Sequence, residues 1–302
     1  MSPADWWWIP ITVWAAFAQT VRNAAQRSLT AELGTLGATL VRFLYGLPFA
    51  LLWFLCVESF AKEQTPTPNI RFLGWVLIGA VSQIAATALL LRTMQERNFA
   101  LGVAYSKSEV LQVALFAFVF LGDPVTLPLA VAVASGTGGV LLLSSQGLKW
   151  GWARGWTTRP ALLGLASGAG FALASVGYRG AALALDDTSF LMAAAFTLLL
   201  AQALQTLLLG GWLLARAPAT VANVLRAWRR SLLAGFMGAA ASAGWFTAFA
   251  LEPAAHVRTL GLVELIFSYL VSLKLFRERL SGLELAGMAL LVVGVAVITL
   301  GR

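Results

Sequence analysis

The sequence predicts an all-α integral membrane protein with ten transmembrane helices, arranged as two inverted five-helix repeats around a central cavity. Three observations lead to this prediction: a composition that is 59% hydrophobic and only 11% charged, ten apolar windows of membrane-spanning length, and a match between the two halves of the sequence. A soluble globular protein is about one quarter charged, so a soluble chain this apolar could not cover its surface. Long, uniformly apolar windows predict helices and exclude a membrane β-barrel, whose strands alternate over about ten residues.

The predicted spans follow one another with short connections. A helix needs about 20 mostly apolar residues to cross the hydrocarbon core. By this criterion the spans are expected at 6–27, 35–57, 72–93, 99–121, 125–146, 161–183, 188–215, 231–251, 254–276 and 281–300. Tryptophans 6 to 8 form an interfacial anchor at the start of the first span, and Gly46 and Pro48 are expected to bend the second. No connection is long enough to hold a soluble domain.

An offset of 155 residues aligns the two halves of the chain. It places Glu109 on Glu264 and Gly139 on Gly294, and it also superimposes the acidic turns before the last helix of each half. Three matches at one offset indicate an internal repeat. The two glutamates then occupy one position in the fourth and ninth spans, near the centre of each helix.

The repeats are expected at 1–147 and 148–302. Because each holds five helices, two tandem copies must cross the membrane in opposite directions, which is the architecture of secondary transporters. Fourteen Lys and Arg residues, Arg22 among them, fall in connections on one side, and five, including Arg258, fall on the other. This asymmetry predicts that both termini lie outside the cytoplasm of a multi-pass inner (plasma) membrane protein.

Three stretches carry a resemblance to a known family: "VRFLYGLPFALL", "SEVLQVALFAFVFLGDPVTL" and "VELIFSYLVSLKLFRERLSGLELAGMALLVVGVAVI". With these motifs the whole chain resembles the EamA-type ten-helix branch of the drug/metabolite transporter superfamily, and most of all its amino-acid exporters of the YddG type. The resemblance implies transport of small metabolites by alternating access. The chain departs from the family in one respect, because Val110 and Leu265 stand where a proline often follows the acidic residue.

Glu109 and Glu264 are the first candidates for a functional site. A charged side chain near the middle of a membrane costs roughly 2.5–3.5 kcal/mol or more, so such residues usually serve a function. One interpretation is a midplane site that binds a substrate ammonium group or a coupling proton. The other is that each carboxyl hydrogen-bonds a neighbouring helix and holds the bundle together. The sequence leaves both interpretations open.

Three further candidates lie near Glu109. Tyr105, Glu109 and Gln112 share one helical face at spacings of four and three residues, so this face is a candidate cavity lining. Lys107 is about 200° from Glu109 around a regular helix, so we do not expect a local ion pair. Lys107 is expected either to reach another helix or a substrate carboxylate, or to extend toward the membrane surface.

The remaining candidates are polar or aromatic residues within other spans: Arg42, Tyr45, Gln19, Gln83 and Trp245. The planar guanidinium of Arg42 suits a carboxylate, either that of a substrate or that of a neighbour such as Glu32. Trp245 is flanked by glycine and alanine, so it either projects into a cavity or fills a gap against lipid. Glycine-rich stretches such as "GLASGAG" are expected to let helices approach closely, not to bind phosphate.

The predicted function is export of small metabolites, amino acids above all and aromatic or hydrophobic ones among them, by a monomer in the lipid bilayer. The alternative is a drug or lipid-linked substrate exporter on the same scaffold, and a more remote one is a membrane enzyme or sensor. No ATP-binding loop, metalloprotease motif or nucleophile–base pair is recognisable, and one histidine and one cysteine cannot build a standard zinc site. We therefore expect no enzymatic activity, no metal, no cofactor and no nucleic-acid partner.

Overall fold

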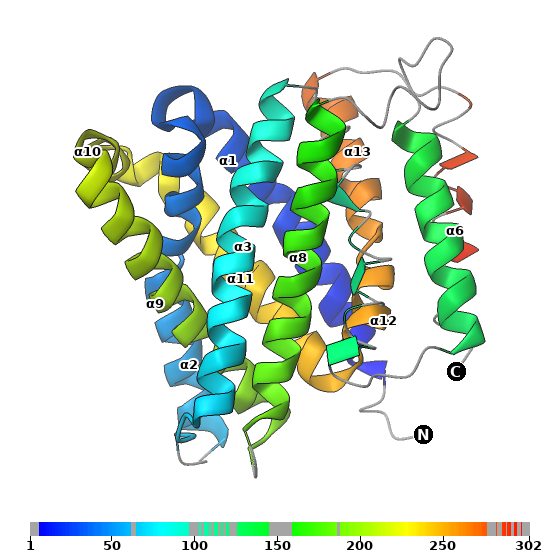
Figure 1. The fold of residues 1–302 in the computed structure, drawn as a ribbon, viewed down its shortest axis with the longest axis horizontal. Helices are drawn as coiled ribbons and strands as arrows, with labels where there is room; N and C mark the ends of the chain where they lie inside the picture. The colour runs from blue at the N-terminus through cyan, green and yellow to red at the C-terminus, as the bar shows by residue number, and fades with distance from the viewer. Residues whose placement is uncertain are drawn as a thin grey trace.

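The computed structural model describes residues 6–61, 65–96, 126–144, 159–185 and 188–276, together with single residues within 103–120 and 282–297. All regular elements in these ranges are helices (Figure 1). Their bounds are α1 (Trp8–Leu44), α2 (Leu47–Ala61), α3 (Ile70–Glu96), α6 (Leu127–Ser144), α8 (Arg159–Leu183), α9 (Phe190–Arg216), α10 (Pro218–Arg226), α11 (Trp228–Leu251), α12 (Ala254–Leu260) and α13 (Val263–Phe276).

The described helices have the character of a membrane protein. Five segments are long and apolar enough to cross a bilayer: Trp8–Phe60, Ile70–Glu96, Phe190–Arg216, Trp228–Leu251 and Ala254–Val271. Large apolar side chains remain exposed on their outer faces, and a soluble protein rarely leaves so much apolar surface in water. The helical membrane class is thus confirmed. The count of ten spans and the inverted repeat remain predictions, since spans 99–121 and 281–300 lie mostly outside the described residues.

Helix α1 contains a reversal that separates the first two predicted spans. Gly34 has φ 69° and ψ 174°, a backbone conformation that favours glycine. Gln26 Nε2 donates to the carbonyl of Ala38 at 2.7 Å, although twelve residues of straight helix would separate the two by about 18 Å. The chain therefore folds back at Gly34, between the spans predicted at 6–27 and 35–57.

The second predicted span is interrupted where the sequence placed a bend. Helix α1 ends at Leu44 and α2 begins at Leu47. Helix α11 approaches this break closely, because a Cβ added to Gly235 would lie 2.5 Å from the carbonyl carbon of Tyr45. A glycine at this position of α11 allows the two backbones to meet at the break.

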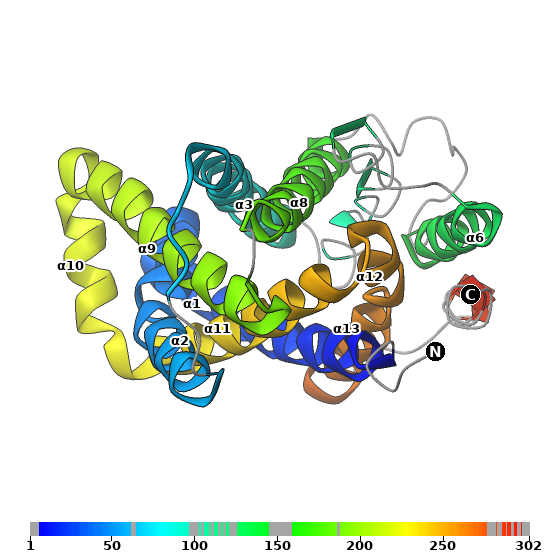
Figure 2. The same cartoon turned by 90° about the horizontal axis from the view of Figure 1, so that it is seen from below.

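Helices α3 and α8 pack along a stripe of small residues, and both views place them side by side (Figure 2). A Cβ added to Gly177 would lie 2.9 Å from the backbone nitrogen of Gly79, and one added to Gly170 would lie 2.9 Å from the Cβ of Ala86. The predicted role of the "GLASGAG" stretch in close helix packing is confirmed here.

The ninth predicted span is broken into two helices. Gly261 and Leu262 form a turn between α12 and α13, and the ring of Trp245 occupies the space beside Gly261, where a Cβ would lie 2.5 Å from it. The sequence predicted one continuous helix over 254–276, which is wrong at this point. Discontinuous helices of this kind place backbone ends and polar groups inside membrane transporters.

Candidate functional site

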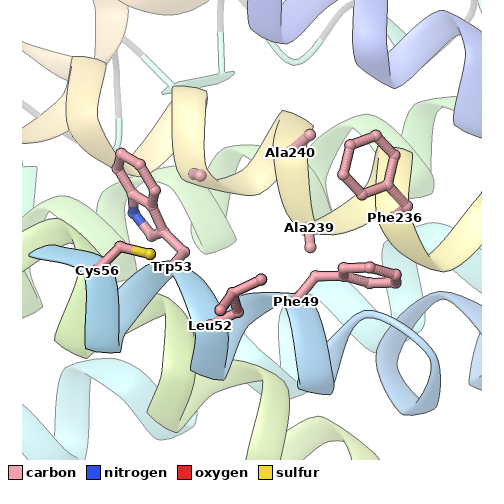
Figure 3. A pocket seen from close by; sticks show the side chains of 8 residues that line it. Phe49, Leu52, Trp53, Cys56, Phe236, Ala239 and Ala240 are labelled. Carbon is pink, nitrogen blue, oxygen red and sulfur yellow. The ribbon is translucent and has the colours of Figure 1, made fainter.

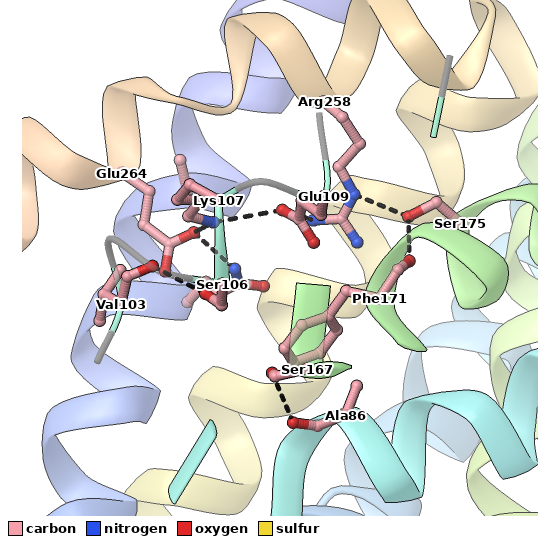
Figure 4. A network of polar contacts seen from close by, with 12 residues as sticks. Ala86, Val103, Ser106, Lys107, Glu109, Ser167, Phe171, Ser175, Arg258 and Glu264 are labelled. Carbon is pink, nitrogen blue, oxygen red and sulfur yellow. Dashed lines mark hydrogen bonds and ion pairs between the residues drawn. The ribbon is translucent and has the colours of Figure 1, made fainter. Parts of the chain in front are cut away.

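Four charged side chains meet in the interior of the bundle: Lys107, Glu109, Arg258 and Glu264 (Figure 4). Each is at most 5% exposed, and Glu264 is fully buried. Lys107 and Glu109 come from the first predicted repeat, whereas Arg258 lies on α12 and Glu264 in the first turn of α13. We call these four residues the central ion cluster.

Glu264 has the most complete set of partners in the central ion cluster. Its Oε2 accepts from Lys107 Nζ at 2.5 Å and from Gln19 Nε2 at 2.5 Å, and its Oε1 accepts from Asn23 Nδ2 at 3.0 Å. Burying a carboxylate is strongly unfavourable unless it is paired and hydrogen-bonded. Three donors on two oxygens meet that requirement.

The orientations of the two amides around Glu264 follow from their other neighbours. Trp245 Nε1 can only donate, and it donates to Gln19 Oε1 at 2.9 Å, so the NH₂ group of Gln19 must face Glu264. Arg22 also only donates, and its Nη2 binds Asn23 Oδ1 at 2.6 Å, which turns the Asn23 NH₂ group toward Glu264. The hydrogen bonds from Lys107, Gln19 and Asn23 therefore all point toward Glu264, whose two oxygens accept them.

Glu109 is held by longer contacts than Glu264. Its Oε1 lies 3.4 Å from Lys107 Nζ and 3.7 Å from Arg258 Nη1. Arg258 is itself fixed by other groups, since its Nε donates to Ser175 Oγ at 2.7 Å and its guanidinium lies 4.5 Å from the ring centre of Trp245. Within the central ion cluster, the contacts of Glu109 are therefore the ones that can be exchanged at least cost.

Helical structure is interrupted next to both acidic residues. Lys107 lies in a turn two residues before Glu109, and Leu262, at the corresponding position 155 residues later, lies in the turn before α13. Our expectation that Lys107 and Glu109 point to opposite sides was wrong, because the 200° separation holds only in a regular helix. The turn occurs without the proline that is common in the resembled family.

Two buried arginines of α1 face α11. Arg22 and Arg42 are 0% and 1% exposed, although sequence reasoning counted Arg22 among the loop residues. Arg42 Nη1 donates to Thr87 Oγ1 at 3.0 Å. The suggested pairing of Arg42 with Glu32 is not observed, since Glu32 pairs with Arg230 at 3.2 Å.

The other predicted site residues lie outside the central ion cluster. Gln83 belongs to a buried triad in which Tyr178 and Gln205 both donate to its Oε1, at 2.9 and 2.7 Å. Tyr45 donates to the carbonyl of Val224 at 2.9 Å and faces away from the central ion cluster. Gln112 is half-buried.

Tyr105 lies outside the described residues. Among the residues predicted at sequence level, the structure thus joins Lys107, Glu109, Glu264, Gln19 and Trp245 in one network.

Sequence reasoning missed Arg258 and Asn23 as members of this network. Arg258 was counted with the residues of the outer side, because it lies near the start of the span predicted at 254–276, yet it is only 5% exposed. When Arg22 and Arg258 are removed from the count of loop residues, thirteen basic residues remain on the predicted cytoplasmic side and four on the opposite side. The predicted orientation is therefore unchanged. The signal that could have found Arg258 is its position six residues before an intramembrane glutamate.

Apolar grooves run along the flank of the bundle, away from the central ion cluster. One lies between α2 and α11 (Figure 3) and is lined by Phe49, Leu52, Trp53, Cys56, Phe236, Ala239, Ala240 and Ala243. A second, with an empty volume of about 930 Å³, shares Trp53, Ala240 and Ala243 with the first and extends to Trp7 and Trp14. The two grooves form a continuous apolar surface that we call the lateral groove.

No group of three or more potential metal ligands comes together in the described part of the chain.

Comparison with known proteins gives a fold but no family. No family model and no curated protein matches the sequence. A solved structure described only as "Crystal structure of protein" is similar, with 18% identity and a TM-score of 0.67 over 97% of this chain and 96% of the other. At this identity the similarity shows the overall fold alone.

Proposed function

We propose that the protein is a secondary transporter that exports small polar metabolites, with amino acids as the expected substrates, by alternating access across the inner membrane. The observation that carries the proposal is the central ion cluster. Its acidic and basic groups come from distant parts of the chain, and Glu109 and Glu264 each pair with a cation from the other half. Buried ionisable residues within membrane segments usually line a substrate or ion pathway.

Glu109 and Glu264 have different roles in the proposed mechanism. Glu264 is the fixed counter-ion, because three donor groups already hold its two oxygens. Glu109 is the group that exchanges partners. A substrate ammonium group, or a proton, can replace its long contacts with Lys107 and Arg258. Release of these two cations from Glu109 would let α12 and the segment around Lys107 separate when the open side changes.

Amino-acid flux into proteoliposomes tests the proposal. Wild type is compared with Glu109→Gln and with Glu96→Gln, a control that removes an equally negative but more exposed carboxylate paired with Arg92. We expect saturable flux from wild type and Glu96→Gln and a loss of at least tenfold in Glu109→Gln, with all three proteins monodisperse in detergent. Equal flux in wild type and Glu109→Gln would refute the role of Glu109, and a pH gradient that changes wild-type flux would add proton coupling to the mechanism.

The lateral groove favours a second candidate function, export of a drug or lipid-linked substrate. Its lining is almost entirely apolar, and Leu52 and Trp7 on its border are 59% and 60% exposed to the surroundings of the protein. Such a surface suits an apolar chain that enters from the side. Filling it with Ala240→Trp should abolish efflux of an apolar dye while leaving amino-acid flux intact. Loss of amino-acid flux in Ala240→Trp, with dye efflux unchanged, would favour the amino-acid function.

A further inference from the structure

Arg22 and Arg42 are charged side chains that the proposed mechanism does not use. Both approach one glycine of α11: a Cβ added to Gly238 would lie 3.2 Å from Arg42 Cγ and 3.4 Å from Arg22 Cδ. The reversal at Gly34 makes this possible, because it brings two positions twenty residues apart back to the same level of the bundle. Two guanidinium groups with like charge are thus held together in the interior.

Among the described side chains, the hydrogen-bond partners of both arginines are neutral groups. Arg22 donates to the amide oxygen of Asn23, and Arg42 donates to the hydroxyl of Thr87. Arg22 Nη1 and Arg42 Nε are buried and have no hydrogen-bond partner. Two like charges in an apolar interior repel each other, and each unsatisfied donor adds a further penalty. The pair is therefore unfavourable unless an anion joins it.

The charges around the pair do not supply that anion. Lys107 pairs with Glu264 and Arg258 with Glu109, so these two carboxylates neutralise two cations. A third buried carboxylate, Glu252, is engaged by His256 at the junction of α11 and α12. Among the described side chains, neither Arg22 nor Arg42 is therefore paired with a carboxylate.

We propose that Arg22 and Arg42 form a binding site for an oxyanion group, carboxylate or phosphate, and that the ligand carries a net negative charge. The inference rests on the proposed transport function and narrows its substrate class from amino acids in general to those with a net negative charge, the acidic amino acids, for which a dicarboxylate serves as a probe. A neutral zwitterion would bring one carboxylate and one ammonium group, and its ammonium group would repel the two guanidinium groups. A guanidinium binds both oxygens of a carboxylate or phosphate through parallel hydrogen bonds, and two of them hold one such group from two sides.

Thermal unfolding of the full-length protein in detergent, in a buffer without added small anions, tests the proposal. The probes are glutarate, inorganic phosphate, L-leucine and dioctanoyl-phosphatidylglycerol. We expect a saturable rise of several degrees in melting temperature with glutarate or phosphate and none with leucine. Stabilisation by leucine alone would overturn the proposal, and so would stabilisation by the phospholipid alone, which would assign the site to a lipid headgroup.

The matched variants are Arg22→Met, Arg42→Met and the control Arg230→Met, whose arginine is exposed and paired with Glu32. We expect both interior variants to lose the anion-induced rise while melting, without anion, near the wild-type temperature, because removal of a buried charge without a carboxylate partner offsets the lost hydrogen bonds to Asn23 and Thr87. Arg230→Met should keep the full rise. Anion-induced stabilisation that survives in Arg22→Met and Arg42→Met would overturn the proposal, as would melting of both far below wild type without anion.

These measurements separate the inference from the function it rests on. Anion binding that depends on the arginines, in a protein that moves no solute in proteoliposomes, would support the site and refute transport. Saturable amino-acid flux in a protein that neither glutarate nor phosphate stabilises would refute the anion site and leave transport standing.

Discussion

Replacing Glu264 with glutamine should destabilise the protein more than a change of one atom suggests. The amide can keep its oxygen toward Lys107 and Gln19, but its NH₂ group then faces the NH₂ group of Asn23, 3.0 Å away in the wild type. Asn23 cannot turn around, because its oxygen is held by Arg22. Gln19 cannot turn either, because Trp245 donates to its oxygen. One donor–donor conflict therefore remains in every arrangement.

The magnitude follows from these contacts. At 2.5 Å, the attraction between Lys107 and Glu264 is roughly 6–7 kcal/mol for an effective dielectric constant of about 20. Desolvation offsets much of this, and removal of one partner from a buried pair costs about 3–5 kcal/mol in soluble proteins. Polar interactions inside membrane proteins are weaker, so about 2–3 kcal/mol, including about 1 kcal/mol for the unsatisfied donor, is the expected loss for Glu264→Gln.

The assay is unfolding in mixed micelles, followed by the fluorescence of the twelve tryptophans. A double-mutant cycle with Lys107→Met isolates the pair. We expect Lys107→Met to restore part of the stability lost in Glu264→Gln, because it removes the cation left with only Glu109 nearby at 3.4 Å. A Glu264→Gln protein as stable as wild type would refute the conclusion that both oxygens of Glu264 are acceptors held by converging donors.

Three further outcomes are expected. Gly235→Ala should lower the folded yield and reduce the free energy of unfolding by about 1–3 kcal/mol, because the added Cβ would overlap the backbone of Tyr45. The control Gly211→Ala, whose added Cβ has no atom within 4 Å, should leave both unchanged. Equal melting temperatures of the two variants would contradict the packing of α11 against Tyr45. Cys56, the single cysteine, lines the lateral groove and should react in membranes with an apolar maleimide but not with a charged, membrane-impermeant thiol reagent. Tyr178→Phe should cost about 1–2 kcal/mol by removing the hydroxyl that links Gln83 and Gln205, and an unchanged unfolding midpoint would show that water replaces it.

The sequence was most informative where one pattern determines one structure. Apolar length located the spans that the structure describes, and the predicted bend near Gly46 coincides with the break between α1 and α2. The offset of 155 residues selected Glu109 and Glu264 before any contact was known. A charge near the centre of an apolar helix has few stable environments, so its position alone indicates an interior polar network.

The sequence was least informative where a contact depends on how helices pack. Arg22 and Arg258 lie near the ends of predicted spans, and a long arginine there can reach the membrane surface as easily as the interior. The reversal at Gly34 and the turn at Leu262 decide between these outcomes for the two arginines. Both depend on backbone conformations that hydropathy does not report. Tyr45 shows the converse, since this predicted cavity residue lies at the break between α1 and α2 and donates to the carbonyl of Val224.

The pairing of Lys107 with Glu264 also constrains the order of events during biosynthesis. The two residues are 157 positions apart, and a ribosome that adds 5–20 residues per second needs roughly 8 to 30 s to synthesise the interval. During that time Lys107 is available for insertion while Glu264 does not yet exist. Glu109, two residues away and 3.4 Å from Lys107 in the folded protein, is translated almost simultaneously. Glu264 can therefore join Lys107 only after most of the second half has been synthesised, whereas Glu109 is the acidic neighbour that Lys107 has from the start.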